Sequence, residues 1–184
     1  MKRGFDLAAA SVGLLILAPL VIACAILIRF SSKGPVLFRQ PRVGKNERVF
    51  TCYKLRTMLT NTAHVPTHQM VSSAVTPIGR HLRRLKLDEL PQLWNVLKGE
   101  MSFVGPRPCL PTQQELIAAR RRLGLTKLLP GITGVSQVAG IDMSDPERLA
   151  TSDARYVDAM SLRTDVSLIW QAIAGKGRGD RVSA

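Results

Sequence analysis

The chain has 184 residues, enough for one domain with a sizeable core but too few for two ordinary domains and a membrane segment. Its 26 Lys and Arg against 13 Asp and Glu give a net charge of +13, so we expect an anionic partner: nucleic acid, an anionic lipid surface or a phosphorylated small substrate. Nine scattered aromatics argue against nucleic acid, and three cysteines without C-x-x-C spacing indicate neither a disulfide framework nor a zinc site.

The N-terminal region contains an uncharged run over residues 7–28, about 33 Å long if helical and therefore long enough to cross a hydrocarbon core. A cleaved signal peptide is disfavoured, because the apolar run continues past the cleavage-like site at Ala23-Cys24-Ala25 into a basic body. Pro19 removes the helical hydrogen bond to Leu15 and predicts a kink.

Basic residues flank both ends of this run, Lys2 and Arg3 before it and Arg29 and Lys33 after it. Positive charge prefers the cytoplasmic side of a membrane, so a segment that enters and turns back at the kink satisfies both ends. A spanning helix and a re-entrant segment are both compatible with the residues. In either case the body after Arg29 is expected in the cytoplasm.

The next segments predict a hairpin and a loop. Two β-rich runs, at residues 36–39 and 48–53, flank a turn at 43–46. Residues 60–76 are rich in Thr, Ser, Pro and His without a period, which is typical of a loop.

Helical spacing of apolar residues continues to the C-terminal end. Ile78, Leu82 and Leu85 share one face of a helix whose other positions are basic, which suits a membrane surface, an anionic groove or plain solvent. Further helices are predicted over residues 90–98, over 113–123 with a capping box of Thr112 and Glu115, after Asp145-Pro146, and over 164–173. Residues 175–184 are Gly-rich and basic and predict a disordered tail.

Two adjacent carboxylates, Asp88 and Glu89, stand between a basic run and Pro91. They would cap a helix that contains Pro91, which is the structural interpretation. The surrounding basic residues instead indicate a phosphate site, where one carboxylate holds a divalent cation and the other attacks phosphorus. A glycosidase pair is less natural, because neighbouring helical residues point about 100° apart.

The segment DELPQLWNVLKGEMSFVGPRP, residues 88–108, resembles the signature of the bacterial sugar transferases, the monotopic phosphoglycosyl transferases. The likeness covers nearly the whole chain, and the length resembles that of the minimal single-domain members, such as the enzyme that starts a bacillosamine-type glycan. It includes residues 2–6, 34–40, 54–58, 76–80 and 130–138, with Arg148, Asp153, Tyr156 and Asp165. The sequence departs from the pattern at Ala18-Pro19, commonly Ser-Pro, and at Ile141-Asp142, where many members have Arg-Asn.

The resemblance implies that a UDP-sugar gives its sugar-1-phosphate to polyprenyl (undecaprenyl) phosphate and releases UMP, as the first membrane step of glycan assembly, with Mg²⁺ as cofactor. It implies a covalent intermediate on Asp88 and a metal site at Glu89 with Asp88. The substrate-binding residues it suggests are Arg83 for the lipid phosphate and Pro106, Arg107 and Pro108 for the nucleotide-sugar. We add Lys54 and Arg56 as cations that would face the phosphates.

The expected fold is mainly α with a small β-hairpin (α+β). Residues 1–30 would form a re-entrant helix-break-helix membrane anchor, residues 31–174 a compact cytoplasmic catalytic domain with interfacial amphipathic helices, and residues 175–184 the tail. This places the chain at the cytoplasmic face of the bacterial inner membrane, with membrane lipid as a further partner. The rival hypothesis is a membrane-anchored basic binding protein without catalytic activity; no motif sets the sugar or the oligomeric state.

Overall fold

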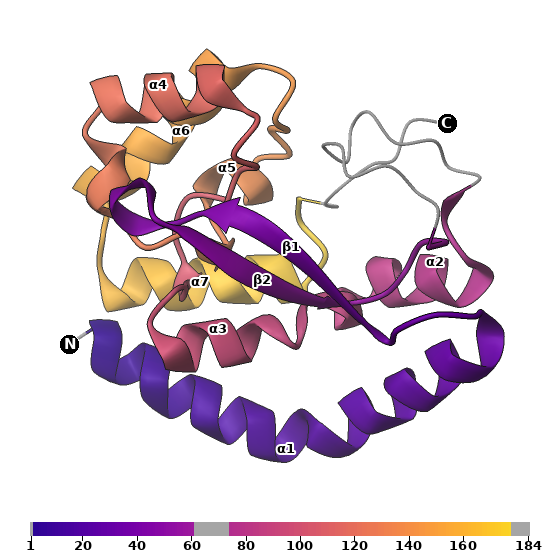
Figure 1. The fold of residues 1–184 in the computed structure, drawn as a ribbon. Coiled ribbons are helices and arrows are strands. Elements are labelled where there is room, and N and C mark those ends of the chain that lie inside the picture. The colour runs from indigo at the N-terminus through magenta and orange to yellow at the C-terminus, as the bar shows by residue number, and fades with distance from the viewer. Residues whose placement is uncertain (1, 61–73, 178–184) are drawn as a thin grey trace.

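The N-terminal apolar run forms one long helix, α1 (Lys2–Ser31), in the computed structural model, which describes residues 2–60 and 74–177. Pro19 lies inside α1, which bends along its length but stays one continuous helix, so the expected helix-break-helix is wrong in this respect (Figure 1). A proline inside a helix removes one backbone hydrogen bond, which accounts for a bend. Within the described residues, α1 is the one helix long and apolar enough to cross a membrane, by length and composition only.

The rest of the described chain is a hairpin followed by short helices and strands. In order these are β1 (Leu37–Val43), the 3₁₀ turn η1 (Lys45–Glu47), β2 (Val49–Leu55), α2 (Pro77–Arg84), η4 (Leu87–Glu89), α3 (Gln92–Lys98), β3 (Ser102–Val104), α4 (Gln114–Arg122), η5 (Leu125–Lys127), β4 (Gly131–Thr133), α5 (Val135–Val138), α6 (Pro146–Asp158) and α7 (Leu162–Ile173).

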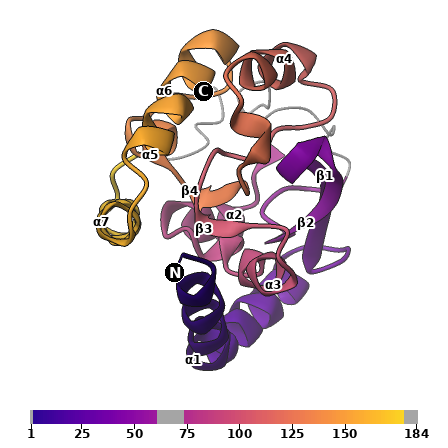
Figure 2. The same ribbon diagram turned by 90° about the vertical axis from the view of Figure 1, so that its left-hand side faces the viewer.

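Two small sheets connect these elements. β1 and β2 pair antiparallel, from Leu37 opposite Leu55 to Val43 opposite Val49, which confirms the predicted hairpin and extends both strands. β3 pairs in parallel with β4, a contact between distant segments that the sequence did not predict. This second sheet lies between α7 on one side and α3 with the hairpin on the other (Figure 2). The mainly helical α+β class is confirmed.

Helix α1 contacts the body along its whole length. At its start, Lys2 Nζ lies 2.6 Å from Asp165 Oδ2 of α7, and Arg3 donates to the carbonyl of Val96 near the end of α3. Its middle packs on α3 and the hairpin, and its last turns pack on β2 and α2 in a cluster of Cys24, Ile28, Leu55 and Leu82. Both ends of α1 are therefore fixed to the same body.

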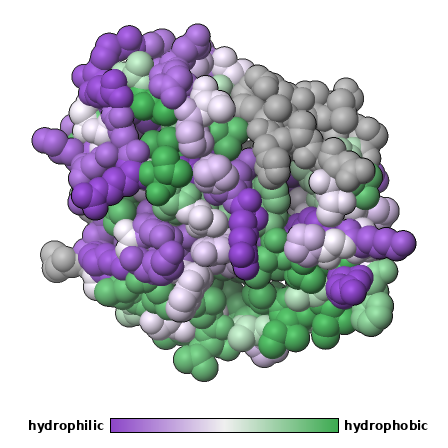
Figure 3. All heavy atoms as spheres, viewed as in Figure 1, coloured by the Kyte–Doolittle hydropathy of each residue, from purple (hydrophilic) through white to green (hydrophobic). Residues whose placement is uncertain are grey.

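The outer face of α1 is apolar and exposed. Figure 3 shows a hydrophobic band along the edge of the molecule that α1 occupies in Figure 1. A core helix would bury such side chains, so this surface indicates contact with an apolar medium. The exposed large apolar residues of α1 are Leu7, Val12, Leu15, Ile16, Leu20, Ile22, Ile26, Leu27 and Phe30.

Most predicted helices are confirmed, but the cap predicted for the helix over residues 113–123 is wrong. The expected helices correspond to α2, α3, α4, α6 and α7, and Gly99 ends α3 with φ 81°. The capping box of Thr112 and Glu115 does not form. The N-cap of α4 is Gln113, whose Oε1 instead accepts from the Leu110 N–H and closes the preceding turn. The predicted loop and tail lie mainly outside the described residues.

Asp6 provides a test of how α1 is attached to the body. Its buried carboxylate accepts from Ser102 Oγ at 2.8 Å and from the Phe103 N–H at 3.2 Å. Asp6→Ala leaves two donors without their acceptor, so we expect the free energy of unfolding to fall by about 1–3 kcal/mol. Thermal unfolding in detergent, followed by circular dichroism, measures the change. Asp158→Ala, at an exposed position, is the control; an equal midpoint for Asp6→Ala and the parent would contradict the attachment.

Candidate functional site

The two carboxylates lie in a separate 3₁₀ turn, η4, before α3. Lys86 precedes this turn in the left-handed region, with φ 56°, and Leu87 packs beneath it against α1 and α2. Asp88 is 7% exposed. The structural interpretation, in which Asp88 caps the helix containing Pro91, is wrong: α3 begins at Gln92, and its N-cap is Pro91, without a side-chain bond. Because Lys86 is left-handed, the chain leaves α2 and forms the separate turn η4. Asp88 lies in that turn and not at the N-cap of α3.

An ion pair connects this turn to the hairpin. Lys54 Nζ of β2 lies 2.8 Å from Glu89 Oε1, and both side chains are more than four-fifths buried. Partial burial weakens the screening by water, so removing either partner would leave a costly charge behind. The pair therefore fixes Glu89 against β2.

Lys54 and Glu89 line a cavity that we call the acid-pair pocket. Its lining includes two further predicted residues, Arg107 and Pro108, so the structure brings four of the predicted site residues together. Asp88 is buried next to Glu89 but does not line this pocket. The remaining lining residues are Arg42, Cys52, Gln92, Gly131, Ile132 and Gln137.

Two buried arginines hold the segment that carries Arg107. Arg42 Nη1 donates to the carbonyl of Pro108 at 2.8 Å, and Arg120 Nη1 donates to the carbonyl of Arg107 at 2.8 Å. Arg120 is in turn paired with the buried Asp153, with 2.6 Å between Nη2 and Oδ2. Backbone carbonyls fixed from two sides give the segment a defined direction.

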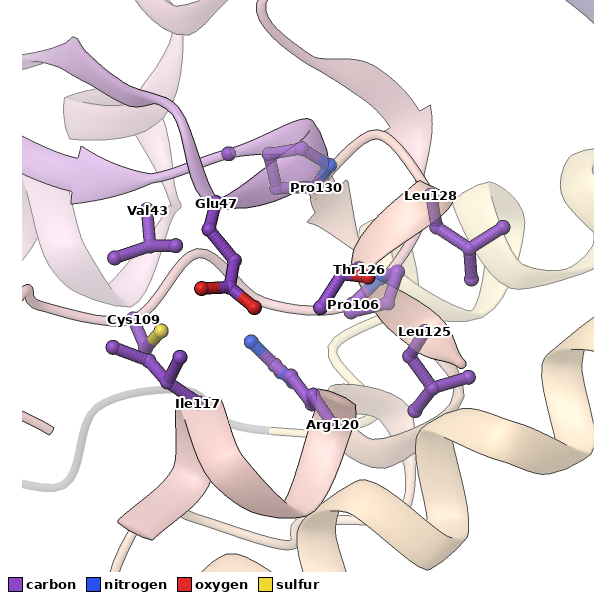
Figure 4. A pocket seen from close by; sticks show the side chains of 11 residues that line it. Val43, Glu47, Pro106, Cys109, Ile117, Arg120, Leu125, Thr126, Leu128 and Pro130 are labelled. Atoms are coloured by element: carbon purple, nitrogen blue, oxygen red, sulfur yellow. The ribbon is translucent and has the colours of Figure 1, made fainter. Parts of the chain in front are cut away.

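Pro106 faces a different cavity, which we call the hairpin-tip pocket. It has about 370 Å³ of empty space, against about 260 Å³ for the acid-pair pocket. Figure 4 shows Glu47 and Arg120 pointing into it among mainly apolar side chains. Both charges are already engaged, Glu47 with Arg121 and Arg120 with Asp153, and the hydrogen bond from Arg121 lowers the pKa of Glu47. The smaller pocket is therefore the better candidate for phosphate chemistry.

Arg56 and Arg83, which we call the guanidinium pair, lie on either side of Thr57 near the end of α1. Arg83 Nε donates to Thr57 Oγ1 at 2.9 Å, and Arg56 Nη2 donates to the Ser32 carbonyl at 2.8 Å. The Nη1 atom of each is buried and finds no acceptor among the described residues. Burial, and then the charge of Arg29, lowers the pKa of Arg56. Buried cationic donors without acceptors indicate an anion site.

Most of the sequence matches a known protein family. Residues 1–176 match the family model described as bacterial sugar transferase. The chain belongs to the bacterial sugar transferase family.

Several curated relatives of this family member carry functional names. It is 42% identical to an undecaprenyl-phosphate glucose phosphotransferase of Komagataeibacter xylinus, with 94% of this chain and 35% of the relative covered. It is 37% identical to a UDP-N-acetylgalactosamine-undecaprenyl-phosphate N-acetylgalactosaminephosphotransferase of Aeromonas hydrophila, with 94% and 43% covered. It is also 37% identical to the exopolysaccharide production protein ExoY of Rhizobium meliloti, with 94% and 83% covered. The chain thus spans less than half of the first two relatives.

Cys52 is the one thiol in the acid-pair pocket of this transferase-family chain. Burial raises the pKa of the Cys52 thiol, against the opposing charges of Lys54 and Arg42. A thiol held neutral is a poor nucleophile, since the thiolate is the reactive form. The carboxylates are therefore the better candidates for attack on phosphorus.

Sequence reasoning did not place Arg42, Cys52, Gln92 or Gln137 in the site. A signal existed for the first two. Side chains alternate between the faces of a strand, and in the observed register Gln40 lies opposite Cys52, two residues from Arg42 and Lys54 respectively. Because Lys54 lies on this face of the hairpin, the alternation of side chains also pointed to Cys52 and Arg42. Gln92 and Gln137 carried no such signal.

Arg120 offers a test of the segment's support. Arg120→Met removes the donor to the Arg107 carbonyl and leaves Asp153 buried without its cation, so we expect a loss of about 3–5 kcal/mol in unfolding free energy. Arg122→Met is a matched control on the same helix, because Arg122 pairs with Glu147 at an exposed position. We expect about 0–1 kcal/mol there. Thermal melting in detergent compares the two, and equal losses would contradict the buried role of Arg120.

Proposed function

We propose that this chain transfers a sugar-1-phosphate from a UDP-sugar to polyprenyl phosphate, undecaprenyl phosphate in a bacterial membrane, and releases UMP. The observation that carries the proposal is the acid-pair pocket, where Glu89, Lys54 and Arg107 meet next to a buried Asp88. Two relatives are named for sugar-phosphate transfer to undecaprenyl phosphate, which supports the same reaction class.

In the proposed reaction Asp88 is the nucleophile. One carboxylate oxygen attacks the phosphorus that bears the sugar, and the bond from this phosphorus to the oxygen of UMP breaks. UMP leaves, and an aspartyl phosphosugar remains. An oxygen of polyprenyl phosphate then attacks the same phosphorus, which releases the carboxylate and gives a sugar joined to the lipid by a diphosphate.

Lys54 and Arg107 are proposed to bind the diphosphate of the donor. Both line the acid-pair pocket, and the hydrogen bond from Arg120 to the Arg107 carbonyl holds the backbone that carries the Arg107 side chain. A guanidinium can bind phosphate oxygens through two parallel hydrogen bonds, whereas an ammonium acts as a point charge. The two cations would therefore position the reacting phosphorus beside η4.

Asp88 and Glu89 are proposed to hold Mg²⁺. No cluster of three or more His, Cys, Asp or Glu suited to a metal is found in the described ranges, so substrate phosphates would have to complete the ligand set. Two adjacent carboxylates beside a phosphate pocket fit this requirement, because proteins commonly hold Mg²⁺ through one or two carboxylates and substrate phosphates. When bound, the ion would neutralise charge on the diphosphate. Glu89 would then exchange its bond to Lys54 for the ion.

The guanidinium pair is proposed to bind the phosphate of the lipid. The unpartnered Nη1 atoms of Arg56 and Arg83 supply two donors, and Arg56 is attached to Ser32 just after α1. A lipid phosphate at the membrane surface would reach the guanidinium pair while its hydrocarbon tail stays in the bilayer. The attacking oxygen would thus approach η4 from the membrane side.

The anchor is proposed to be re-entrant, with the body at the cytoplasmic face of the inner membrane. Contacts from Lys2 to α7 and from Ile28 to β2 attach both ends of α1 to one body. A spanning helix would separate those ends by a hydrocarbon core of about 30 Å. An exposed apolar stripe on α7, formed by Val166, Trp170 and Ile173, supports an interfacial position for that helix. The rival binding protein loses its main support, because Asp88 does not cap a helix.

Asp88→Asn tests the catalytic proposal. The amide keeps the size of the side chain but is a poor nucleophile, so UMP release should fall by about a thousandfold or more. The assay measures UMP from a panel of UDP-linked N-acetylhexosamines, deoxy-amino sugars and hexoses, with polyprenyl phosphate and Mg²⁺ present. Asp158→Asn, the same change at an exposed position, should keep the parental rate. An Asp88→Asn protein that turns over as fast as the parent would disprove the mechanism.

Single-cysteine labelling tests the topology. Gly4 and Lys33 are exposed near the two ends of α1, and Leu15 is 80% exposed near its middle. With a membrane-impermeant maleimide, we expect Gly4→Cys and Lys33→Cys to react only from the cytoplasmic side of oriented vesicles. Leu15→Cys should be shielded by lipid and react only after detergent is added. Labelling of Gly4→Cys from the outer side alone would establish a spanning helix instead.

A further inference from the structure

The side chain of Gln137 lines the acid-pair pocket in a defined orientation. It belongs to α5, which follows β4 directly, and its Nε2 donates to the carbonyl of Ile132 at 3.0 Å. A carbonyl can only accept, so the amide nitrogen must face Ile132, and the opposite flip would bring two oxygens together. The Oε1 atom is therefore directed away from Ile132 as an acceptor.

This Oε1 atom is buried and accepts no hydrogen bond from the described residues. Buried acceptors in folded proteins are almost always paired, with protein, water or a ligand, because an unpaired one loses its solvation without compensation. Because Gln137 lines the acid-pair pocket, we take a bound ligand as the group that supplies the missing donor. Gln137 Oε1 is therefore a buried acceptor that still needs a donor.

The lining of the pocket shows which part of a ligand would supply that donor. The charged lining residues come from the hairpin, η4 and the segment 106–108, with Lys54, Glu89 and Arg107 the chief examples. The lining from β4 and α5 is neutral, with Gly131, Ile132 and Gln137. Phosphates bind where the cations are, so a neutral amide acceptor suits an uncharged part of the same molecule.

We propose that Gln137 Oε1 accepts a hydrogen bond from an N–H or O–H group in the uncharged part of the sugar-nucleotide donor and thereby contributes to donor selection. The proposal rests on the proposed function. Three parts of a UDP-sugar have this chemistry: the N3–H of uracil, the hydroxyls of the ribose, and the hydroxyl or amide groups of the sugar. A site built around a buried acceptor rejects an analogue without the matching donor, because the acceptor is then left unpaired.

The test combines two variants with substrate analogues. Gln137→Met removes the acceptor, and Gln137→Lys removes it while keeping a donor for the Ile132 carbonyl, which provides a second variant if the first does not fold. Each is assayed with the UDP-sugar that the parent uses best, with its N3-methyluridine counterpart, with its deoxyribose counterparts, and with its deoxy-sugar counterparts. Release of the nucleoside monophosphate gives kcat/KM for every pair.

We expect Gln137→Met to lower kcat/KM for the natural donor by roughly tenfold to a hundredfold, and to cause no further loss with the one analogue that lacks the matching group. For Gln137→Lys, the ratio of kcat/KM for the natural donor to kcat/KM for that analogue should likewise fall towards one. If the variants lose the difference in kcat/KM between the natural donor and the N3-methyl analogue, the partner of Oε1 is uracil. If they lose the difference for a deoxyribose or a deoxy-sugar analogue, the partner is the hydroxyl that this analogue lacks.

Gln114→Met is the matched control, because Gln114 Nε2 also donates to a backbone carbonyl, that of Pro111, but at an exposed position on α4. It should leave every kcat/KM unchanged. If both Gln137 variants affect all donors by the same factor, or none, then water alone satisfies Oε1 and the inference is overturned. If the parent itself releases UMP from no UDP-sugar, the proposed function fails instead.

Discussion

An ion pair between a strand and a turn organises the candidate site. Lys54 and Glu89 come from elements that are far apart in sequence, and their partly buried contact of 2.8 Å holds η4 against the hairpin. Both groups would be expensive to leave unpaired at that depth, so the pair strongly favours one arrangement of the two elements. In the proposed function, a phosphate of the ligand would pair with Lys54, and a cation would pair with Glu89. The contact that holds η4 against the hairpin thus places both groups in the pocket where the proposed ligands would bind.

The apolar helix lies directly beneath this arrangement. The last turns of α1 pack with Leu55, which follows Lys54, and with Leu87, which precedes Asp88. The apolar cluster that contains the chain neighbours of Lys54 and Asp88 therefore includes side chains of α1. This proximity explains how one short chain could serve a water-soluble donor and a lipid acceptor. The pocket opens among cations from the hairpin and the segment 106–108, whereas the guanidinium pair lies by the end of α1.

Periodicity predicted the elements well, because both the hairpin and the helices bury one regular face. It could not predict the pairing of β3 with β4, since three residues per strand are too few for a pattern. The cap assigned to Asp88 failed because left-handed Lys86 starts a separate turn, and a lysine gives no sign of that conformation. The resemblance suggested Glu89 and Arg107, and the charge of Lys54 suggested that residue. Gln137 escaped notice because the orientation of its buried, unpaired acceptor depends on a bond to the Ile132 carbonyl, which only the folded chain defines.

The most direct test of the account is to trap the intermediate. The purified chain would be incubated with Mg²⁺ and a UDP-sugar labelled with ³²P on the phosphate that bears the sugar, without polyprenyl phosphate, and its peptides would be mapped by mass spectrometry. The account predicts a phosphosugar on Asp88 and stoichiometric UMP, followed by loss of the label when polyprenyl phosphate is added. UMP release that occurs only in the presence of the lipid, from a chain that never carries label, would contradict it.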